Sequence, residues 1–330
     1  MRTDISGHAR AHARTAAGSL VVVAALAALS ACSTSSGSGS DKATASGGAE
    51  SGEGGSGKVL HVVAAENFWG SVAQQLGGSH TDVKSIISNP NADPHDYEPT
   101  AADGRTVASA QYTIVNGIGY DAWADKLLSA NPGSGRTDLK VGDLVGLKPG
   151  GNPHRWYSPD DVHKVIERIT GDYKKLDPAD AAYFDAQKKT YETQTLAPYN
   201  KLVGDIKAKY AGTPVGASES IVTPLADGLG LKMLTPESFL DAISEGTDPT
   251  AKDKSAIDAQ IQNKQIKVYV YNSQNSTPDV AAQVKAAKAA GIPVATVTET
   301  LTLAGTSFQD WQVRQLTDIE KALAQATGKQ

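Results

Sequence analysis

Short runs of β-branched residues alternate with longer amphipathic stretches through most of this chain, and the series occurs twice. Alternation of this kind is typical of β–α–β units, in which helices cover a mainly parallel sheet. The sequence therefore predicts an α/β fold with two Rossmann-like lobes. The expected strands are residues 58–66, 83–88 and 112–117 in the first lobe and residues 214–218, 266–272 and 292–298 in the second.

The segment between the two series has apolar residues at helical spacing, which predicts one long helix that joins the lobes. Asp177 is the expected N-cap, Pro178 suits the first helical position, and Pro198 is a site where the helix would kink. The expected boundaries are residues 58–178 for the first lobe, 179–209 for the linking helix and 210–330 for the second lobe.

The amino-terminal residues have the features of an export signal. Residues 1–31 contain a basic leader and an apolar run, Leu20 to Leu29, that is too short to span a bilayer as a permanent helix. The run ends in Leu-Ser-Ala-Cys, which resembles a lipobox, so Cys32 is expected to carry a lipid that anchors the protein to the bacterial cell membrane on its extracytoplasmic side. Cys32 is the only cysteine, which excludes a disulfide within the chain. Residues 32–57 are rich in Ser and Gly and predict a flexible tether.

The net charge argues against nucleic acid as a partner. The chain carries a formal charge of −5, and removal of the basic leader would make it more acidic. Clusters of basic residues, which nucleic-acid binding requires, are absent from the sequence. Cations are the ligands that this charge favours.

Two histidines lie in similar Pro-His turns. His95 stands between Pro94 and Pro99 in "NADPHDYEPT", and His154 follows a proline in "GNPHRWYSPDDV", ahead of a helix that Ser158 or Asp160 would cap. Stiff loops keep a ligand preorganised. Since both turns are expected at strand-to-helix junctions, both imidazoles are predicted at the carboxyl edge of the sheet, where open α/β sheets bind ligands.

These residues resemble the metal-binding receptor lipoproteins of zinc and manganese ABC transporters, whose hallmark is a Pro-His-x-Tyr-Glu-Pro loop. "DPHDYEPT" reproduces that hallmark, and "AAENFWGSVAQQLGG", "NGIGYDAWADKLL" and "FQDWQVRQLTDIEKAL" extend the resemblance over residues 58–327. The resemblance implies a monomeric solute-binding receptor, without enzymatic activity, that captures a divalent metal between its lobes and delivers it to an ABC permease.

The resemblance also implies a third and a fourth metal ligand from the second lobe. Counting back from Gly230 and Leu231 leads to Glu219, where zinc-type relatives usually have histidine and manganese-type relatives glutamate. The acidic residue that follows the last strand is Glu299. With His95 and His154, these carboxylates would neutralise a divalent cation, and a nitrogen and oxygen set without sulfur suits Zn, Mn or Fe(II).

The sequence departs from the family pattern in two places. "ADGRTVASAQ" follows the first histidine motif without the histidine-rich loop of many zinc-type relatives. Asn272 stands where relatives often have an acidic residue after the penultimate strand, which removes an auxiliary carboxylate.

Simpler interpretations exist for several of these residues. Glu219 is also placed to cap the following helix, and Glu299 to be a solvated charge at a strand end. The remaining histidines are interpreted as a core histidine in an apolar strand (His61), a turn residue (His80), a residue on a helix face (His163) and two residues of the leader (His8 and His12).

Two other functional classes stay open at this stage. A metalloenzyme could use the same four ligands, although neither a His-Glu-x-x-His nor a Gly-x-Ser-x-Gly motif is present. A metal-dependent surface adhesin is the other alternative, and no segment of the sequence marks an adhesive surface.

Overall fold

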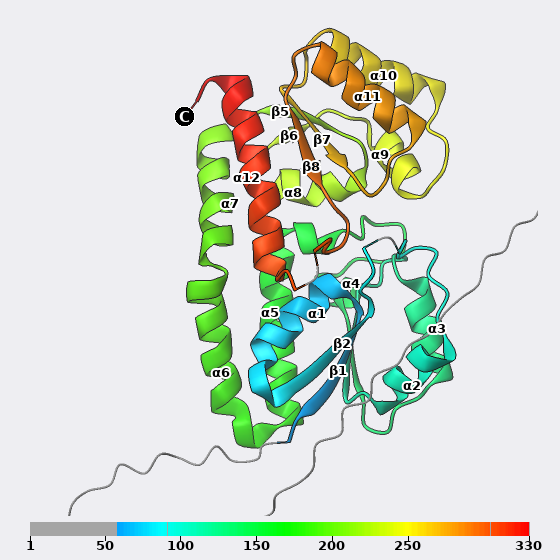
Figure 1. Cartoon of the computed structure of the whole chain (residues 1–330), viewed down its shortest axis with the longest axis vertical. Coiled ribbons are helices and arrows are strands. Elements are labelled where there is room, and N and C mark those ends of the chain that lie inside the picture. The colour runs from blue at the N-terminus through cyan, green and yellow to red at the C-terminus, as the bar shows by residue number, and fades with distance from the viewer. Residues whose placement is uncertain (1–57, 91, 304, 330) are drawn as a thin grey trace, which may run out of the picture. The chain divides into compact units, whose positions relative to one another are not determined.

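Two four-stranded parallel sheets form the two lobes of the computed structural model, which describes residues 58–90, 92–303 and 305–329 (Figure 1). The predictions for residues 1–31 and 32–57, for Cys32, and for His8 and His12 lie outside the described residues. Among the described helices, none combines the length and the apolar character that crossing a membrane requires.

The two sheets have the same topology. The first has the order β2-β1-β3-β4 and the second the order β6-β5-β7-β8, with every neighbouring pair parallel. This confirms the α/β fold and the repeated organisation. The strands of the first lobe are β1 (Leu60–Glu66), β2 (Thr81–Ile87), β3 (Tyr112–Val115) and β4 (Thr137–Lys140), and those of the second are β5 (Pro214–Ala217), β6 (Lys232–Met233), β7 (Val268–Asn272) and β8 (Val294–Val297).

All six predicted strands are present, and the two that the sequence analysis missed, β4 and β6, are edge strands. Strand β4 reads Thr-Asp-Leu-Lys, and β6 has only two residues. Edge strands are commonly short and charged because this discourages pairing with other chains. A search for apolar β-branched runs therefore passes over them.

Helices precede or follow each strand and cover the sheets (Figure 1). In the first lobe they are α1 (Asn67–Gly77), α2 (Ala101–Ser109), α3 (Ala122–Ala130), α4 (Val141–Val145) and α5 (Pro159–Leu176). In the second lobe they are α8 (Thr223–Gly228), α9 (Glu237–Ser244), α10 (Ala251–Gln262), α11 (Pro278–Ala289) and α12 (Phe308–Thr327).

The linking segment is helical but not one uninterrupted helix. It consists of α6 (Ala181–Thr190), a π-helical turn η4 (Tyr191–Thr195) and α7 (Ala197–Tyr210). The N–H of Leu196 donates to Tyr191 O at 2.7 Å, a bond that spans five residues instead of four. Pro198 explains the irregular turn, because its ring displaces the carbonyl four residues earlier and it offers no N–H.

Asp177 and Pro178 take their expected positions, but in a short 3-10 turn, η3 (Pro178–Asp180), instead of at the start of the long helix. Asp177 is both the C-cap of α5 and the N-cap residue of η3, and its side chain makes no cap hydrogen bond. The chain therefore turns a corner between α5 and α6, where the sequence analysis expected a helix to start.

Apolar packing is continuous between the lobes. The ring of Trp69 on α1 stacks with Phe308 on α12 at 6.5 Å, and Tyr157 packs on Trp311 at 5.6 Å. The hydroxyl of Tyr157 donates to Thr298 O at 2.7 Å. Residues of the first lobe thus share one core with the end of the chain.

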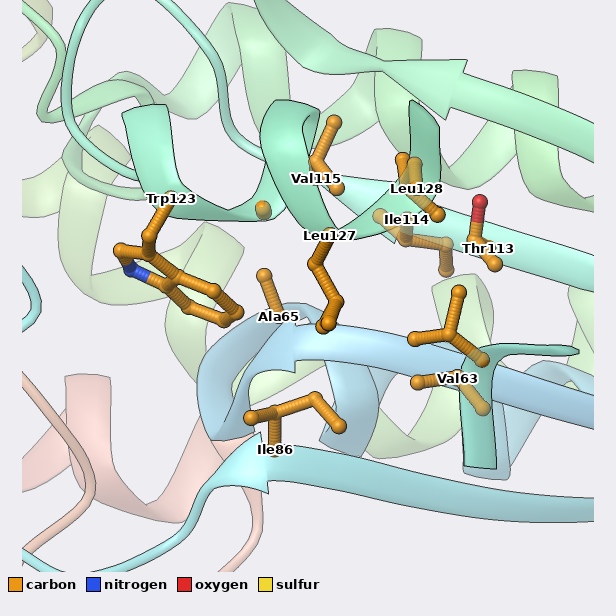
Figure 2. A pocket seen from close by; sticks show the side chains of 11 residues that line it. Val63, Ala65, Ile86, Thr113, Ile114, Val115, Trp123, Leu127 and Leu128 are labelled. Atoms are coloured by element: carbon orange, nitrogen blue, oxygen red, sulfur yellow. The ribbon is translucent and has the colours of Figure 1, made fainter. Parts of the chain in front are cut away.

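A small apolar cavity lies between the first sheet and helices α2 and α3 (Figure 2). Its volume of about 10 Å³ has room for one water at most, and apolar walls keep such a space dry. It is a gap in the packing rather than a ligand site. The residues that line it are Val63, Ala65, Ile86, Val107, Thr113, Ile114, Val115, Trp123, Ala124, Leu127 and Leu128.

Replacement of Gly228 by alanine tests the close contact between α8 and α5. A Cβ at Gly228 would lie 2.5 Å from Cδ of Pro159, and a proline ring cannot move aside as a flexible side chain can. We expect Gly228→Ala to destabilise the protein by about 1–3 kcal/mol in chemical denaturation. Gly204→Ala is the matched control, because an added Cβ in α7 meets nothing within 4 Å, and it should stabilise the protein by about 0.5–1 kcal/mol. Equal effects of the two substitutions would contradict this interpretation.

Candidate metal centre

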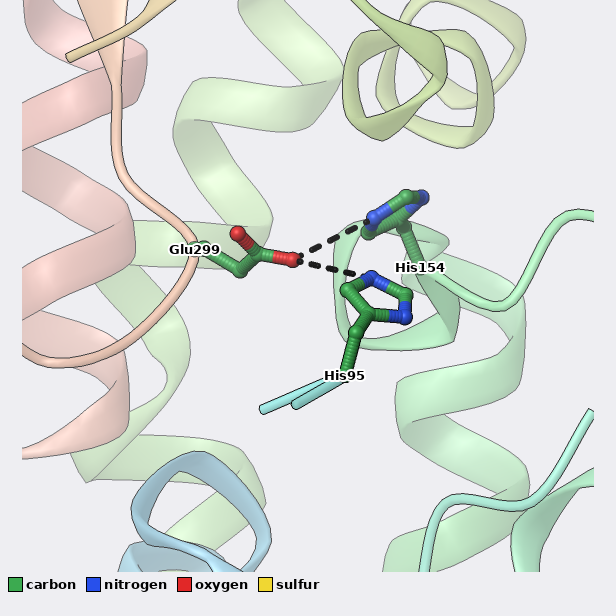
Figure 3. A group of neighbouring side chains, drawn as sticks. All are labelled: His95, His154 and Glu299. Carbon is green, nitrogen blue, oxygen red and sulfur yellow. Dashed lines mark ion pairs between the residues drawn. The ribbon is translucent and has the colours of Figure 1, made fainter. Parts of the chain in front are cut away.

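Three of the four predicted ligands converge at one point (Figure 3). Oε1 of Glu299 lies 3.7 Å from Nε2 of His95 and 3.6 Å from Nε2 of His154. His95 lies in the loop between β2 and α2, His154 between α4 and α5, and Glu299 after β8. The donor atoms therefore come from both lobes, and all lie within 4.8 Å of one another.

The separations suit a shared cation better than direct hydrogen bonds. A hydrogen bond between nitrogen and oxygen spans about 2.7–3.2 Å, which is shorter than either distance to Glu299. Two ligands on one tetrahedral zinc ion, each about 2.0–2.2 Å from the metal, are roughly 3.3–3.6 Å apart. The three side chains are thus spaced as donors to a common ion.

An Asx turn and an aromatic ring hold His95. Its N–H donates to Oδ1 of Asp93 at 2.9 Å, and the carbonyl of the buried Pro94 accepts a bond from Trp123 Nε1 at 2.9 Å. The imidazole packs edge-on against Tyr120, with ring centroids 4.7 Å apart. The loop is fixed by these contacts as well as by its prolines.

The same Asx-Pro-His turn holds His154. Its N–H and its Nδ1 both lie 3.0 Å from Oδ1 of Asn152, whose Nδ2 donates to Ser220 O at 2.7 Å. Since that amide nitrogen is engaged by Ser220, the amide oxygen faces the ring, and His154 Nδ1 must be the donor. The proton on Nδ1 leaves a lone pair on Nε2, which points toward Glu299 (Figure 3).

His154 is 1% exposed. Burial lowers the pKa of its imidazole from 6.5 to about 4, against the opposing effect of the Glu219 carboxylate. The ring is therefore neutral at physiological pH, as a metal ligand must be. The prediction that His154 lies at a strand-to-helix junction was wrong, because α4 separates it from β4.

Gln274 positions Glu299. Its Oε1 accepts the N–H groups of Glu299 at 2.6 Å and of Thr300 at 3.0 Å, and its Nε2 donates to Pro90 O in the first lobe. The Glu299 side chain is 15% exposed, so it is not a solvated charge at a strand end. Burial raises the pKa of its carboxyl, although His95 opposes the shift.

Glu219, the fourth predicted ligand, lies beside this group and is not one of the three converging donors. Its carboxylate accepts a hydrogen bond from Nδ2 of Asn272 and another from Nδ2 of Asn275 at 2.7 Å. Burial, followed by the charge of Glu299, raises the pKa of Glu219 from 4.5 to about 7. It precedes a 3-10 turn, η5 (Ser220–Val222), but its side chain does not cap it.

Asn272 lies between the two carboxylates. Its Nδ2 donates to Glu219 and lies 3.5 Å from Oε2 of Glu299, while its Oδ1 accepts the N–H of Gln274 at 2.9 Å. An acidic residue here would place a third negative charge against the other two. The amide that departs from the family pattern is therefore a donor that both glutamates share.

An open cleft leads to His95 and His154 and has an acidic wall that the sequence analysis missed. Glu237 and Asp241 of α9 and Glu245 at its C-cap line it. Burial raises the pKa of Asp241, and its two acidic neighbours raise it further. Carboxylates at an entrance attract cations and speed their encounter with a site. Their spacing along α9 was visible in the sequence, but nothing there placed this helix beside the two histidines.

Of the other histidines, His61 was wrongly assigned to the core. Its side chain is 59% exposed, because it lies near the start of β1, and its Nδ1 is 3.5 Å from Oδ2 of Asp82. His163 lies half-buried on α5, and His80 ends a 3-10 turn, as expected.

Replacement of Asn272 by aspartate tests its role between the carboxylates. We expect Asn272→Asp to lower the unfolding free energy of the metal-free protein by about 1–3 kcal/mol, because it removes buried hydrogen bonds and adds a like charge. The measurement is urea denaturation of chelator-treated protein. Asn263→Asp makes the same chemical change at an exposed helix end and should have little effect. If both variants unfold like the wild-type protein, the amide of Asn272 does not stabilise the fold by separating Glu219 and Glu299.

Proton release on metal binding tests the raised pKa of Glu219. A carboxyl with a raised pKa stabilises the metal-free fold fully below its unfolded value near 4.5, and this contribution is lost as pH rises through about 7. A bound cation favours the deprotonated form of Glu219 instead, so we expect metal binding to release the proton from this carboxyl. Calorimetry in buffers of different ionisation enthalpy should show that wild type releases more protons than Glu219→Gln at pH 6, and that this excess falls as pH rises through about 7. A difference that does not change with pH would refute the assignment.

Comparisons with known proteins agree with this geometry. Residues 62–322 match the model of the family described as zinc-uptake complex component A, periplasmic (ZnuA). The manganese-binding lipoprotein MntA of Halalkalibacterium halodurans is 27% identical over 154 residues, which are 45% of this chain and 50% of the relative. The zinc-binding lipoprotein AdcA of Streptococcus pneumoniae is 26% identical over 288 residues, with 78% of this chain and 54% of the relative covered. The chain thus spans about half the length of these curated relatives.

Solved structures show the same fold. The Mn-bound S38A mutant of a periplasmic metal-binding protein from Candidatus Liberibacter asiaticus has a TM-score of 0.68 and 20% identity, with 80% of this chain and 99% of that chain covered. The family match includes every predicted ligand, from His95 to Glu299. The chain belongs to the ZnuA family of zinc-uptake components.

Proposed function

We propose that this protein is an extracytoplasmic solute-binding lipoprotein that captures a divalent transition metal and delivers it to an ABC permease. The observation that carries the proposal is the convergence of His95, His154 and Glu299, from both lobes, at the separations of ligands on one ion. Membership of a family of zinc-uptake components supports a role in uptake rather than in adhesion or catalysis.

The donor chemistry defines the cargo as Zn or Mn, with Fe(II) as a further candidate. Two neutral imidazoles and carboxylates bind all three ions, and affinity alone would favour Zn over Mn. The relatives named above are a manganese-binding and a zinc-binding lipoprotein. Metal competition in solution would decide between these ions.

We propose Glu219 as the fourth ligand, which joins the other three when the cation arrives. Its carboxylate would exchange an amide contact from Asn272 or Asn275 for the metal. The cation would also offset burial and the charge of Glu299, which together raise the pKa of Glu219. Metal binding is thus coupled to charge neutralisation across the two glutamates.

The remaining predictions complete this proposal. Residues 1–31 would be removed as a signal peptide, Cys32 would carry the lipid anchor, and residues 32–57 would be the tether. Residues 58–178 and 210–330 would be the metal-binding lobes, with residues 179–209 between them. The receptor would act as a monomer, with the permease as its partner and without nucleic acid.

Single substitutions of the four ligands test the function directly. We expect His95→Ala, His154→Ala, Glu219→Ala and Glu299→Ala each to weaken Zn or Mn binding by more than the 10–100-fold that loss of an outer-shell partner typically costs. Isothermal titration and the metal-induced rise in melting temperature are the measurements, because ligand binding stabilises the native state.

His61→Ala is the control for these variants, since this histidine is exposed and does not belong to the converging group. It should bind metal like the original. If His95→Ala and Glu299→Ala fold normally and keep wild-type affinity, the proposed function loses its basis.

A further inference from the structure

We propose a second divalent-cation site, formed by His80, Asp177 and Asp180 at the corner between α5 and α6. Each of these residues offers one donor atom, and the three atoms lie within 4.8 Å of one another. One nitrogen and two carboxylate oxygens suit a zinc-class cation, with water as the fourth ligand.

The three donors are brought together from distant parts of the sequence. His80 ends the 3-10 turn η1 (Gly78–His80) before β2, whereas Asp177 and Asp180 flank the turn η3 after α5. Nδ1 of His80 lies 2.9 Å from Oδ2 of Asp180, which is a hydrogen-bond distance, so a bound cation would replace this bond and separate the two atoms slightly. The cluster therefore joins two turns that are 100 residues apart.

The buried carboxylate of Asp177 distinguishes this cluster from an ordinary ion pair. It is 7% exposed, and its Oδ2 is buried without a hydrogen-bond partner among the described residues. A buried carboxylate oxygen without a partner is costly, and a cation would satisfy it. His80 and Asp180 are 19% and 27% exposed at their side chains, so an ion from solvent can reach the group.

Packing holds the histidine in place. Its ring stacks on Tyr183 of α6 with centroids 3.9 Å apart and meets Phe184 edge-on at 6.0 Å. The hydroxyl of Tyr183 accepts the N–H of Ser79 at 3.1 Å. The 3-10 turn is thus fixed to α6 before any ion binds, which lowers the cost of ordering a ligand.

The electrostatic field at the end of α5 also favours a cation at this cluster. Asp177 directly follows α5, an 18-residue helix whose last carbonyls carry partial negative charge. The lysines in the last turn of this helix are engaged elsewhere. Lys174 pairs with Asp185 at 2.7 Å and Lys175 with Asp172 at 2.9 Å.

The second site is separate from the first. His80 precedes β2 and His95 follows it, so the two sites lie at opposite ends of a seven-residue strand that is roughly 20 Å long. Groups this far apart act independently in most proteins. A cation here would tie the turn before β2 to the corner from which α6 begins.

Zinc titration of the full, untagged chain that carries His95→Ala and His154→Ala tests the proposal. This background lacks two ligands of the principal site, and we expect it to retain about one zinc per chain by equilibrium dialysis and metal analysis. Adding His80→Ala should weaken that binding about tenfold or more. Adding Asp180→Asn should do the same while keeping an oxygen opposite Nδ1 of His80, so this variant decides the question if His80→Ala does not fold.

His61→Ala in the same background is the matched control, because His61 and Asp82 form an exposed His-Asp pair 3.5 Å apart that is not part of a three-donor group. It should leave zinc binding unchanged. The proposal is overturned if the background binds no zinc, or if the folded His80 and Asp180 variants bind it as well as the background does. Neither result bears on the principal site, which is measured in the chain with its own ligands intact.

Discussion

The burial of two neighbouring carboxylates, Glu219 and Glu299, is the constraint around which this protein is organised. Burial raises the pKa of both carboxyls, the charge of Glu299 raises that of Glu219 further, and Asn272 donates hydrogen bonds into the space between them. The neutral imidazole of His154 adds no charge that could balance the pair. Two buried carboxyls beside a neutral imidazole give the cleft an acidic character, which favours a cation before coordination geometry is considered.

The same local turn positions both histidines. Asp93 and Asn152 each accept the backbone N–H of the histidine two residues later, across an intervening proline. Tyr120 packs against both rings, at 4.7 Å from His95 and 6.0 Å from His154. Repetition of one local turn around a common aromatic wall gives a rigid half-site. The second lobe supplies the carboxylates through a network of amide side chains.

Much of this arrangement was predictable from sequence. Apolar β-branched runs identified six of the eight described strands, and the Pro-His turns pointed to the two histidines that converge on Glu299, because both signals are local. The edge strands β4 and β6 were missed because they lack apolar runs. The interruption at Tyr191–Thr195 depends on how Pro198 disturbs the preceding turn.

Other features depend on tertiary packing and were not predictable. The exposure of His61 depends on where the sheet ends, and helical periodicity does not place α9 at the cleft. The position of Glu219 beside the converging donors, rather than among them, depends on the amides of Asn272 and Asn275. Residue identity shows that these groups are polar, but their partners come from segments far away in the chain.

The position of α12 constrains the order in which the molecule can be assembled. This last helix covers the first one: Phe308 donates its N–H to Oγ of Ser71 at 2.9 Å, and the amides of Gln75 and Gln309 bond to each other at 2.8 and 2.9 Å. Helices α5 and α6 also pack on α1, but in a chain synthesised from its amino terminus the side of α1 that faces α12 stays uncovered until nearly all residues have been made. The first lobe therefore completes its packing only after α12 has been made, so its final packing depends on one of the last segments of the sequence.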